Sequence, residues 1–118
     1  MINIKEHKHF HFIGIGGIGM SALASILLDN GYEVSGSDIK PSDITDHLKS
    51  QGARIFIQHE SNNVDGCDAV IYTAAISDEN PEIARAKETG IPLYSRADLL
   101  GALMKDQKYS IAISGTHG

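Results

Sequence analysis

The segment Phe10-His11-Phe12-Ile13-Gly14-Ile15-Gly16-Gly17-Ile18-Gly19-Met20-Ser21 places a short apolar strand directly before a glycine-rich loop. The glycines have the Gly-x-Gly-x-x-Gly spacing, and the apolar stripe from Ser21 to Leu28 predicts a helix. In this context Gly14 permits the tight turn, Gly16 lets the backbone approach a pyrophosphate, and Gly19 lets helix and strand pack closely. Free N–H groups and the helix dipole then face the anion, and the Ser21 hydroxyl is a further candidate donor. The segment predicts a diphosphate site, with a glycine turn that serves packing alone as the alternative.

The rest of the chain alternates short apolar runs with amphipathic segments. Further strands are predicted at residues 33–37, 54–57, 68–72, 91–94 and 109–114, with helices opened by Ser42, Asn80 and Ser95. Strands that alternate with helices form βαβ units and a parallel sheet. We expect a Rossmann-like three-layer α/β domain over residues 1–107, with an open five-stranded parallel sheet in the order 3-2-1-4-5.

The composition and net charge of the chain exclude several classes of protein. The chain has 118 residues, a net charge of −5 and a single cysteine, Cys67. A protein that binds nucleic-acid phosphates normally carries a basic excess, so nucleic acid is a poor candidate partner. The polar N-terminus is not a secretory signal, and no apolar run approaches the roughly 20 residues of a membrane span. We expect a cytoplasmic protein without membrane partners.

Two further segments belong to the edge of the sheet where the strands end. Asp38 lies 19 positions after Gly19, where an acid in dinucleotide folds accepts a hydrogen bond from a ribose hydroxyl. The alternative is an Asp that begins the turn before Lys40-Pro41. The loop Thr73–Ser77 follows the fourth strand, where small residues allow a ligand to approach, or it is a plain loop leading into the helix cap.

Other candidates are weighed against structural explanations. His7, His9 and His11 alternate and would share one face of a strand, but no carboxylate or cysteine completes a metal site. They are interpreted as edge or rim histidines, and no metal site is predicted. Cys67 is interpreted as an inert, partly buried thiol.

The last residues, Gly115-Thr116-His117-Gly118, follow the sixth predicted strand. A phosphate-binding P-loop would continue with Lys and then Ser or Thr, but the sequence ends there. We therefore expect residues 108–118 to be the first strand and loop of a second, truncated domain.

The ordered motifs resemble the amino-terminal domain of the Mur ligase family. The resemblance runs from about His9 to the end and is carried by His9–Ser21, Gly31–Asp38, Thr73–Ser77 with Asn80-Pro81-Glu82, Ser95-Arg96-Ala97-Asp98 and Ile111–Gly118. The loop is most similar to the family branch that joins L-alanine to UDP-N-acetylmuramate in peptidoglycan synthesis. That resemblance implies an ATP- and Mg²⁺-dependent ligase of three domains that works through an acyl-phosphate.

The resemblance also implies roles for single residues. The UDP part of the substrate would contact Gly14, Ile15, Gly16, Gly17, Ile18, Gly19, Met20, Ser21, Asp38, Ile39, His59, Thr73, Ala74, Ala75 and Ser77. Backbone N–H groups, rather than Lys or Arg, would hold the diphosphate. Gly115, Thr116, His117 and Gly118 would begin the ATP loop, and no catalytic residue is expected within the chain.

Two other functions remain open from the residues alone. The glycine loop and Asp38 fit an NAD-binding domain of an oxidoreductase or regulatory protein equally well. The third possibility is a non-catalytic protein-interaction module, against which the strand, glycine loop and helix argue. UDP is preferred to NAD on the resemblance only.

Overall fold

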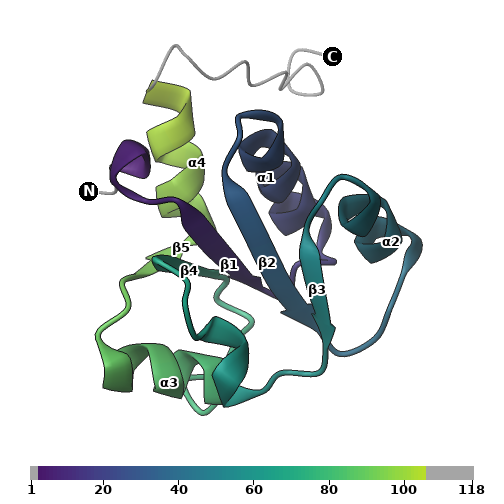
Figure 1. Ribbon diagram of the computed structural model, residues 1–118. Coiled ribbons are helices and arrows are strands. Elements are labelled where there is room, and N and C mark those ends of the chain that lie inside the picture. Colours follow the sequence, from purple (N-terminus) through teal and green to yellow (C-terminus); the bar gives the residue numbers. More distant parts are fainter. Residues whose placement is uncertain (1–2, 106–118) are drawn as a thin grey trace.

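Five parallel strands form the centre of the computed structural model, which describes residues 3–105. The strands are β1 (His9–Ile13), β2 (Glu33–Asp38), β3 (Arg54–Ile57), β4 (Ala69–Tyr72) and β5 (Leu93–Ser95). Their order is β3-β2-β1-β4-β5, and every neighbouring pair is parallel. This confirms the predicted topology. β1 therefore lies between β2 and β4, where the strand order reverses and open α/β sheets bind their ligands (Figure 1).

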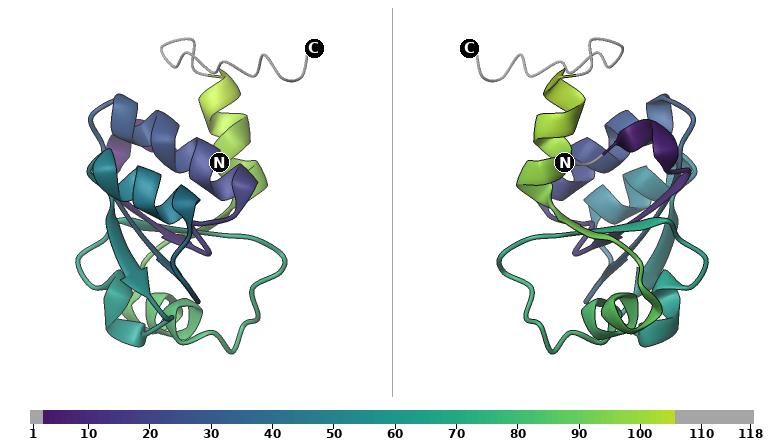
Figure 2. Two further views of the ribbon diagram at one scale, coloured as in Figure 1. Left: turned by 90° about the vertical axis from the view of Figure 1, so that its right-hand side faces the viewer. Right: turned by 90° about the vertical axis from the view of Figure 1, so that its left-hand side faces the viewer.

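Helices cover both faces of the sheet, as Figure 2 shows. The helices α1 (Ile18–Asp29), α2 (Asp43–Ser50) and α4 (Arg96–Lys105) pack on one face. The other face carries α3 (Pro81–Thr89) and the 3-10 turn η2 (Ser61–Val64), and a second 3-10 turn, η1 (Ile4–Glu6), precedes β1. The predicted three layers are confirmed. Within residues 3–105, no helix combines the length and apolarity needed to span a bilayer.

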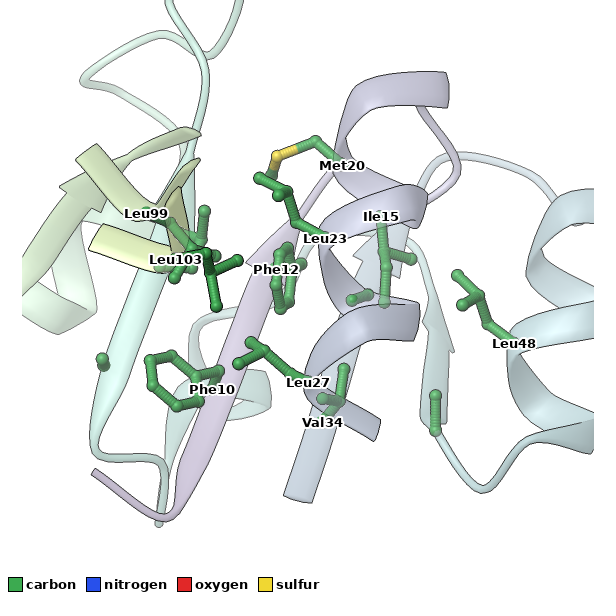
Figure 3. Packing of buried hydrophobic residues seen from close by; sticks show 14 of the residues in the cluster. Phe10, Phe12, Ile15, Met20, Leu23, Leu27, Val34, Leu48, Leu99 and Leu103 are labelled. Atoms are coloured by element: carbon green, nitrogen blue, oxygen red, sulfur yellow. The ribbon is translucent and has the colours of Figure 1, made fainter. Parts of the chain in front are cut away.

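The two faces hold unequal apolar clusters. Phe10 and Phe12 of β1 point to the three-helix face, where they meet Leu23 and Leu27 of α1 (Figure 3). The α3 face has a cluster of six buried residues: Ile13, Val64, Cys67, Val70, Ile83 and Ala86. Alternation along the strands explains the split, because successive side chains point to opposite faces.

Two element boundaries differ from the prediction by two residues or more, and the other strand ends differ by at most one. Helix α1 begins at Ile18 rather than Ser21, because Gly17 caps it and the last glycine of the loop lies in its first turn. Strand β5 begins at Leu93 rather than Ile91, because the Ile91 N–H donates to the Ala86 carbonyl and closes α3. The predicted sixth strand and ATP loop, residues 108–118, lie outside the described residues.

Candidate functional site

The glycine loop is tied to the end of β2. The N–H groups of Gly14 and Ile15 both donate to the Ser37 carbonyl, at 2.8 and 3.0 Å. Gly14 has a φ of +80°, a left-handed conformation that favours glycine. The Ile15 side chain is fully buried, so only its backbone can face a ligand. These bonds fix the turn at the carboxyl edge of β1 and β2.

The donors left for an anion lie in the first turn of α1. The Gly16 N–H donates to Asp38 Oδ2 at 2.8 Å, and the Gly17 N–H donates to the Gly14 carbonyl at 3.1 Å. The N–H groups of the next three residues, 18–20, have no acceptor within the helix, and Gly17 supplies no side-chain cap. Ser21 is not a free donor, because its hydroxyl donates to the Ile18 carbonyl at 2.9 Å. Of the loop donors predicted to face an anion, the ones left unpaired by the loop and the helix are thus the N–H groups of residues 18–20.

Arg96, at the start of α4, lies directly over this turn. A Cβ built on Gly19 would be 3.1 Å from Arg96 Cδ and 3.2 Å from Nη1. The close neighbour of Gly19 is therefore this side chain, rather than the packed strand predicted from the motif. A positive charge at the start of a helix is unfavourable, because the helix dipole is positive there. Arg96 also has no ion-pair partner among residues 3–105. Its charge is available to an anion, whereas the sequence predicts that backbone N–H groups alone hold the diphosphate.

Asp38 and Ile39 lie beside the loop at the end of β2. Asp38 Oδ1 accepts from the Ile39 N–H at 2.7 Å, while Oδ2 accepts from Gly16. A Cβ on Gly16 would lie only 2.6 Å from that Oδ2, so a side chain at position 16 would displace the Asp38 carboxylate. The Ile39 side chain is 69% exposed and the Ile18 side chain 83%. Two apolar side chains thus stand in solvent beside the free donors.

The Thr73–Ser77 loop reaches the same edge from β4. A Cβ on Gly14 would lie 3.9 Å from Ile76 Cδ1, which places the two loops side by side. Ala74 and Ala75 are exposed, while Ser77 accepts from the Glu79 N–H through its hydroxyl. The loop therefore borders the site and also leads into the cap of α3.

His59, the remaining predicted residue, belongs to a buried cluster centred on Glu82 of α3. Its Nδ1 lies 2.7 Å from Ser37 Oγ and 3.4 Å from Glu82 Oε2. The residue before it, Gln58, has a φ of 90°, an uncommon conformation for a non-glycine residue. The chain therefore turns sharply after β3 and brings His59 beside Ser37, the residue that holds the glycine loop.

Glu82 is completely buried and fully hydrogen-bonded. Oε1 accepts from His11 Nε2 at 2.6 Å and from Ser37 Oγ at 2.8 Å. Oε2 accepts from Asn63 Nδ2 at 3.0 Å and from the Glu60 N–H at 3.1 Å. Burial raises the pKa of Glu82, but the bond and charge of His11, with the bonds from Asn63 and Ser37, outweigh burial and hold that pKa below its usual value. The sequence predicted only a helix-starting acid here.

The interpretation of the N-terminal histidines needs correction. His11 is fully buried on the central strand, so it is not a rim residue. His9 and His11 share a face, since both bond Ser35 Oγ at 2.8 Å, but His7 packs against Phe10 and Tyr94. Within the described residues, no group of three or more His, Cys, Asp or Glu side chains could hold a metal ion.

Neither of two cavities in the described structure is lined by residues 14–20, Asp38 or Arg96. One of about 420 Å³ is at the amino edge of the sheet and is lined by His9, Glu33 and Arg54, among others. Another of about 350 Å³ lies between α1 and α2 and includes Ser21. The candidate site is identified by its free donors, its cation and its position at the strand ends.

Comparison with known proteins finds a matching family model and similar curated proteins. The model of the Mur ligase family, catalytic domain, matches residues 9–108. The UDP-N-acetylmuramate–L-alanine ligase of Clostridium botulinum (strain Hall) is 59% identical over 113 residues, which are 96% of this chain and 25% of the relative. The chain thus spans about a quarter of the length of such curated relatives.

Solved structures of two ligases are also similar to this chain. The crystal structure of UDP-N-acetylmuramate-alanine ligase MurC from Thermotoga maritima superposes with a TM-score of 0.80 at 41% identity, covering 84% of this chain and 23% of that one. A murein peptide ligase from Psychrobacter arcticus gives 0.72 at 27% identity, covering 79% and 20%. The oxidoreductase alternative is accordingly the weaker one.

Proposed function

Because the chain belongs to the Mur ligase family, we propose that it binds the UDP part of UDP-N-acetylmuramate for a cytoplasmic ligase that adds L-alanine to that substrate. The observation that carries the proposal is the meeting of the free N–H groups of residues 18–20 with the unpaired guanidinium of Arg96. Both favour a diphosphate, since helix N-termini and arginine forks bind phosphate oxygens. The relatives that carry the same activity in their names support the choice of sugar and amino acid.

The other edge residues fit the nucleoside. In the proposed complex Asp38 accepts a hydrogen bond from a uridine hydroxyl, as each carboxylate oxygen has a second lone pair. Ile39 and Ile18 cover apolar parts of the ligand, and the loop 73–77 borders the base or ribose from the β4 side. In the proposed complex the ligand lies outside the strand ends, at the switch point.

The ATP and Mg²⁺ of the proposed reaction belong to residues outside those described. ATP phosphates and Mg²⁺ would supply activation of the substrate carboxylate, and the four loop residues expected to begin that site are Gly115–Gly118. The role of the described residues is to bind and orient the UDP group. We expect no ligation from them alone.

A ligand titration tests this function. The 118-residue chain is titrated with UDP-N-acetylmuramate and, separately, with NADH, while the amide resonances of residues 18–20 are followed by NMR. The UDP ligand should shift these resonances and NADH should not. Binding of NADH without binding of the UDP ligand would contradict the proposal.

Arg96→Gln sharpens the test. Loss of a charge-assisted bond to phosphate should weaken UDP-N-acetylmuramate binding about tenfold or more and reduce its salt dependence. Arg85→Gln is the matched control, since Arg85 is paired with Asp65 and Glu88 on the α3 side. Equal losses in both variants would show that Arg96 has no specific role.

A further inference from the structure

Glu82 of α3 places its carboxylate against the face of the sheet that α3 covers. None of its side chain is exposed, and its partners come from β1, β2 and the segment after β3. Burying a carboxylate costs free energy unless the carboxylate is fully hydrogen-bonded. An apolar residue at this buried position of α3 would avoid that cost. Packing alone therefore does not explain why a carboxylate with four hydrogen bonds is buried at this position.

The hydrogen atoms of the cluster can be assigned. An ionised carboxylate only accepts, so the single hydroxyl hydrogen of Ser37 is donated to Glu82 Oε1. Ser37 Oγ must then accept its second bond, from His59 Nδ1 at 2.7 Å. Nδ1 of His59 therefore carries a proton. The nearby Oε2 of Glu82, at 3.4 Å, favours the same arrangement.

This assignment leaves Nε2 as the unused nitrogen of His59. Nε2 forms no hydrogen bond within residues 3–105, and 17% of the side chain is exposed. The Ser37 carbonyl accepts from Gly14 and Ile15, so the residue that orients His59 also holds the glycine loop. His59 therefore lies beside the strand end to which the glycine loop is tied, with Nε2 left for a ligand bound at that edge.

We propose that Glu82 is a positioning residue: with Ser37 it keeps the proton on Nδ1 of His59, so that Nε2 binds a phosphate oxygen of the UDP ligand. The role rests on the proposed function. A hydrogen bond from Nε2 to a phosphate oxygen requires a second proton, taken up from solvent as the ligand binds, and the Glu82 carboxylate then balances the added charge. Glu82 itself does not touch the ligand.

The test compares Glu82→Gln and Ser37→Ala with wild type in the 118-residue chain. Side-chain ¹⁵N spectra should show protonated Nδ1 in wild-type His59 and a changed Nδ1 signal in both variants. Both variants should bind UDP-N-acetylmuramate about tenfold more weakly or worse, the factor for one bond to a charged group. Glu88→Gln, an exposed charge loss on the same helix, should leave signal and affinity unchanged.

The outcomes separate the two proposals. If wild type binds the UDP ligand and the folded variants keep both the His59 signal and the affinity, the role of Glu82 is wrong while the proposed function stands. If wild type binds no UDP ligand, the proposed function fails and this role fails with it. Should Glu82→Gln not fold, Ser37→Ala decides, because it removes one hydroxyl and no charge.

Discussion

Gly36 leaves no room for a side chain in the middle of β2. A Cβ at this position would lie 2.5 Å from Cβ and 2.8 Å from Cγ2 of Ile15, whose side chain is fully buried. These Ile15 atoms are close to the backbone of the glycine loop, so they cannot move without moving the loop. The small residue therefore sets how closely the loop approaches the sheet.

Gly36→Ala should destabilise the protein by about 1–3 kcal/mol, the usual cost of overpacking a core. Gly101→Ala is the opposite control: Gly101 lies inside α4 with open space around its Cβ position, so alanine should stabilise by about 0.5–1 kcal/mol. Urea denaturation of the two variants gives both values. Similar stabilities for the two variants would show that Ile15 adapts freely.

Among the helices and strands, the start of α4 determines the position of Arg96. The Asp98 N–H donates to Ser95 Oγ at 3.0 Å, and the Ser95 N–H donates to Asp98 Oδ2 at 3.1 Å. This reciprocal pair is the capping box predicted from the sequence. It fixes the first turn of the helix whose arginine overlies Gly19.

Ser95→Ala should cost about 1 kcal/mol of stability, because one helix-end N–H loses its acceptor. Ser50→Ala is a suitable control, since the Ser50 hydroxyl donates only to a carbonyl of its own helix and is exposed. That control should stay within about 0.5 kcal/mol of wild type. Thermal denaturation followed by circular dichroism compares them, and an equal effect at both positions would refute the capping role.

Local signals predicted elements well and distant pairings poorly. The strands and the helix starts at Ser42, Asn80 and Ser95 follow from short apolar runs and from helix-start residues close together in sequence. The pairing of His11 with Glu82 joins positions 71 apart, which no local pattern reveals. The same holds for Arg96 over Gly19. A buried acid in the first turn of a helix looks in sequence like an ordinary dipole partner.

Among residues 3–105, folding lowers the pKa of three groups, which affects the stability of the whole molecule. Hydrogen bonding from the Lys8 N–H is the main cause for Asp68, assisted by the His9 N–H and opposed by burial. Burial lowers the pKa of His9, against the charges of Glu33 and Asp68. Glu82 is the third group. In each case the unfolded chain binds protons at a higher pH than the folded one.

Stability should therefore be greatest above pH 6.5 and fall on acidification. The loss begins as His9 must be protonated, below its ordinary pKa of 6.5, and continues below 4.5 and 3.8, the ordinary values of Glu82 and Asp68. Urea denaturation at pH 7.5, 5.5 and 3.5 measures this slope. Asp68→Asn should flatten the acidic part, whereas Asp78→Asn, which changes a 91% exposed carboxylate, should not. A flat profile in wild type would contradict the prediction.

Folding also changes the pKa of the buried Cys67 thiol. Burial, with the neighbouring charge of Asp68, raises the pKa of its thiol to about 12, as expected for the inert cysteine predicted from the sequence. Thiolate formation is thereby suppressed on the α3 face.

The unequal layers have a consequence for how the molecule fluctuates. The α3 face is held by six buried apolar residues and by a polar cluster, while the opposite face has a much larger apolar cluster. Segments with few apolar contacts open at a lower free energy than the rest, as separate cooperative units. We expect the α3 layer, which contains Glu82, to be such a unit. Each transient opening of that layer would release His59, so the lifetime of the closed layer would limit the contact that we propose between His59 and a ligand.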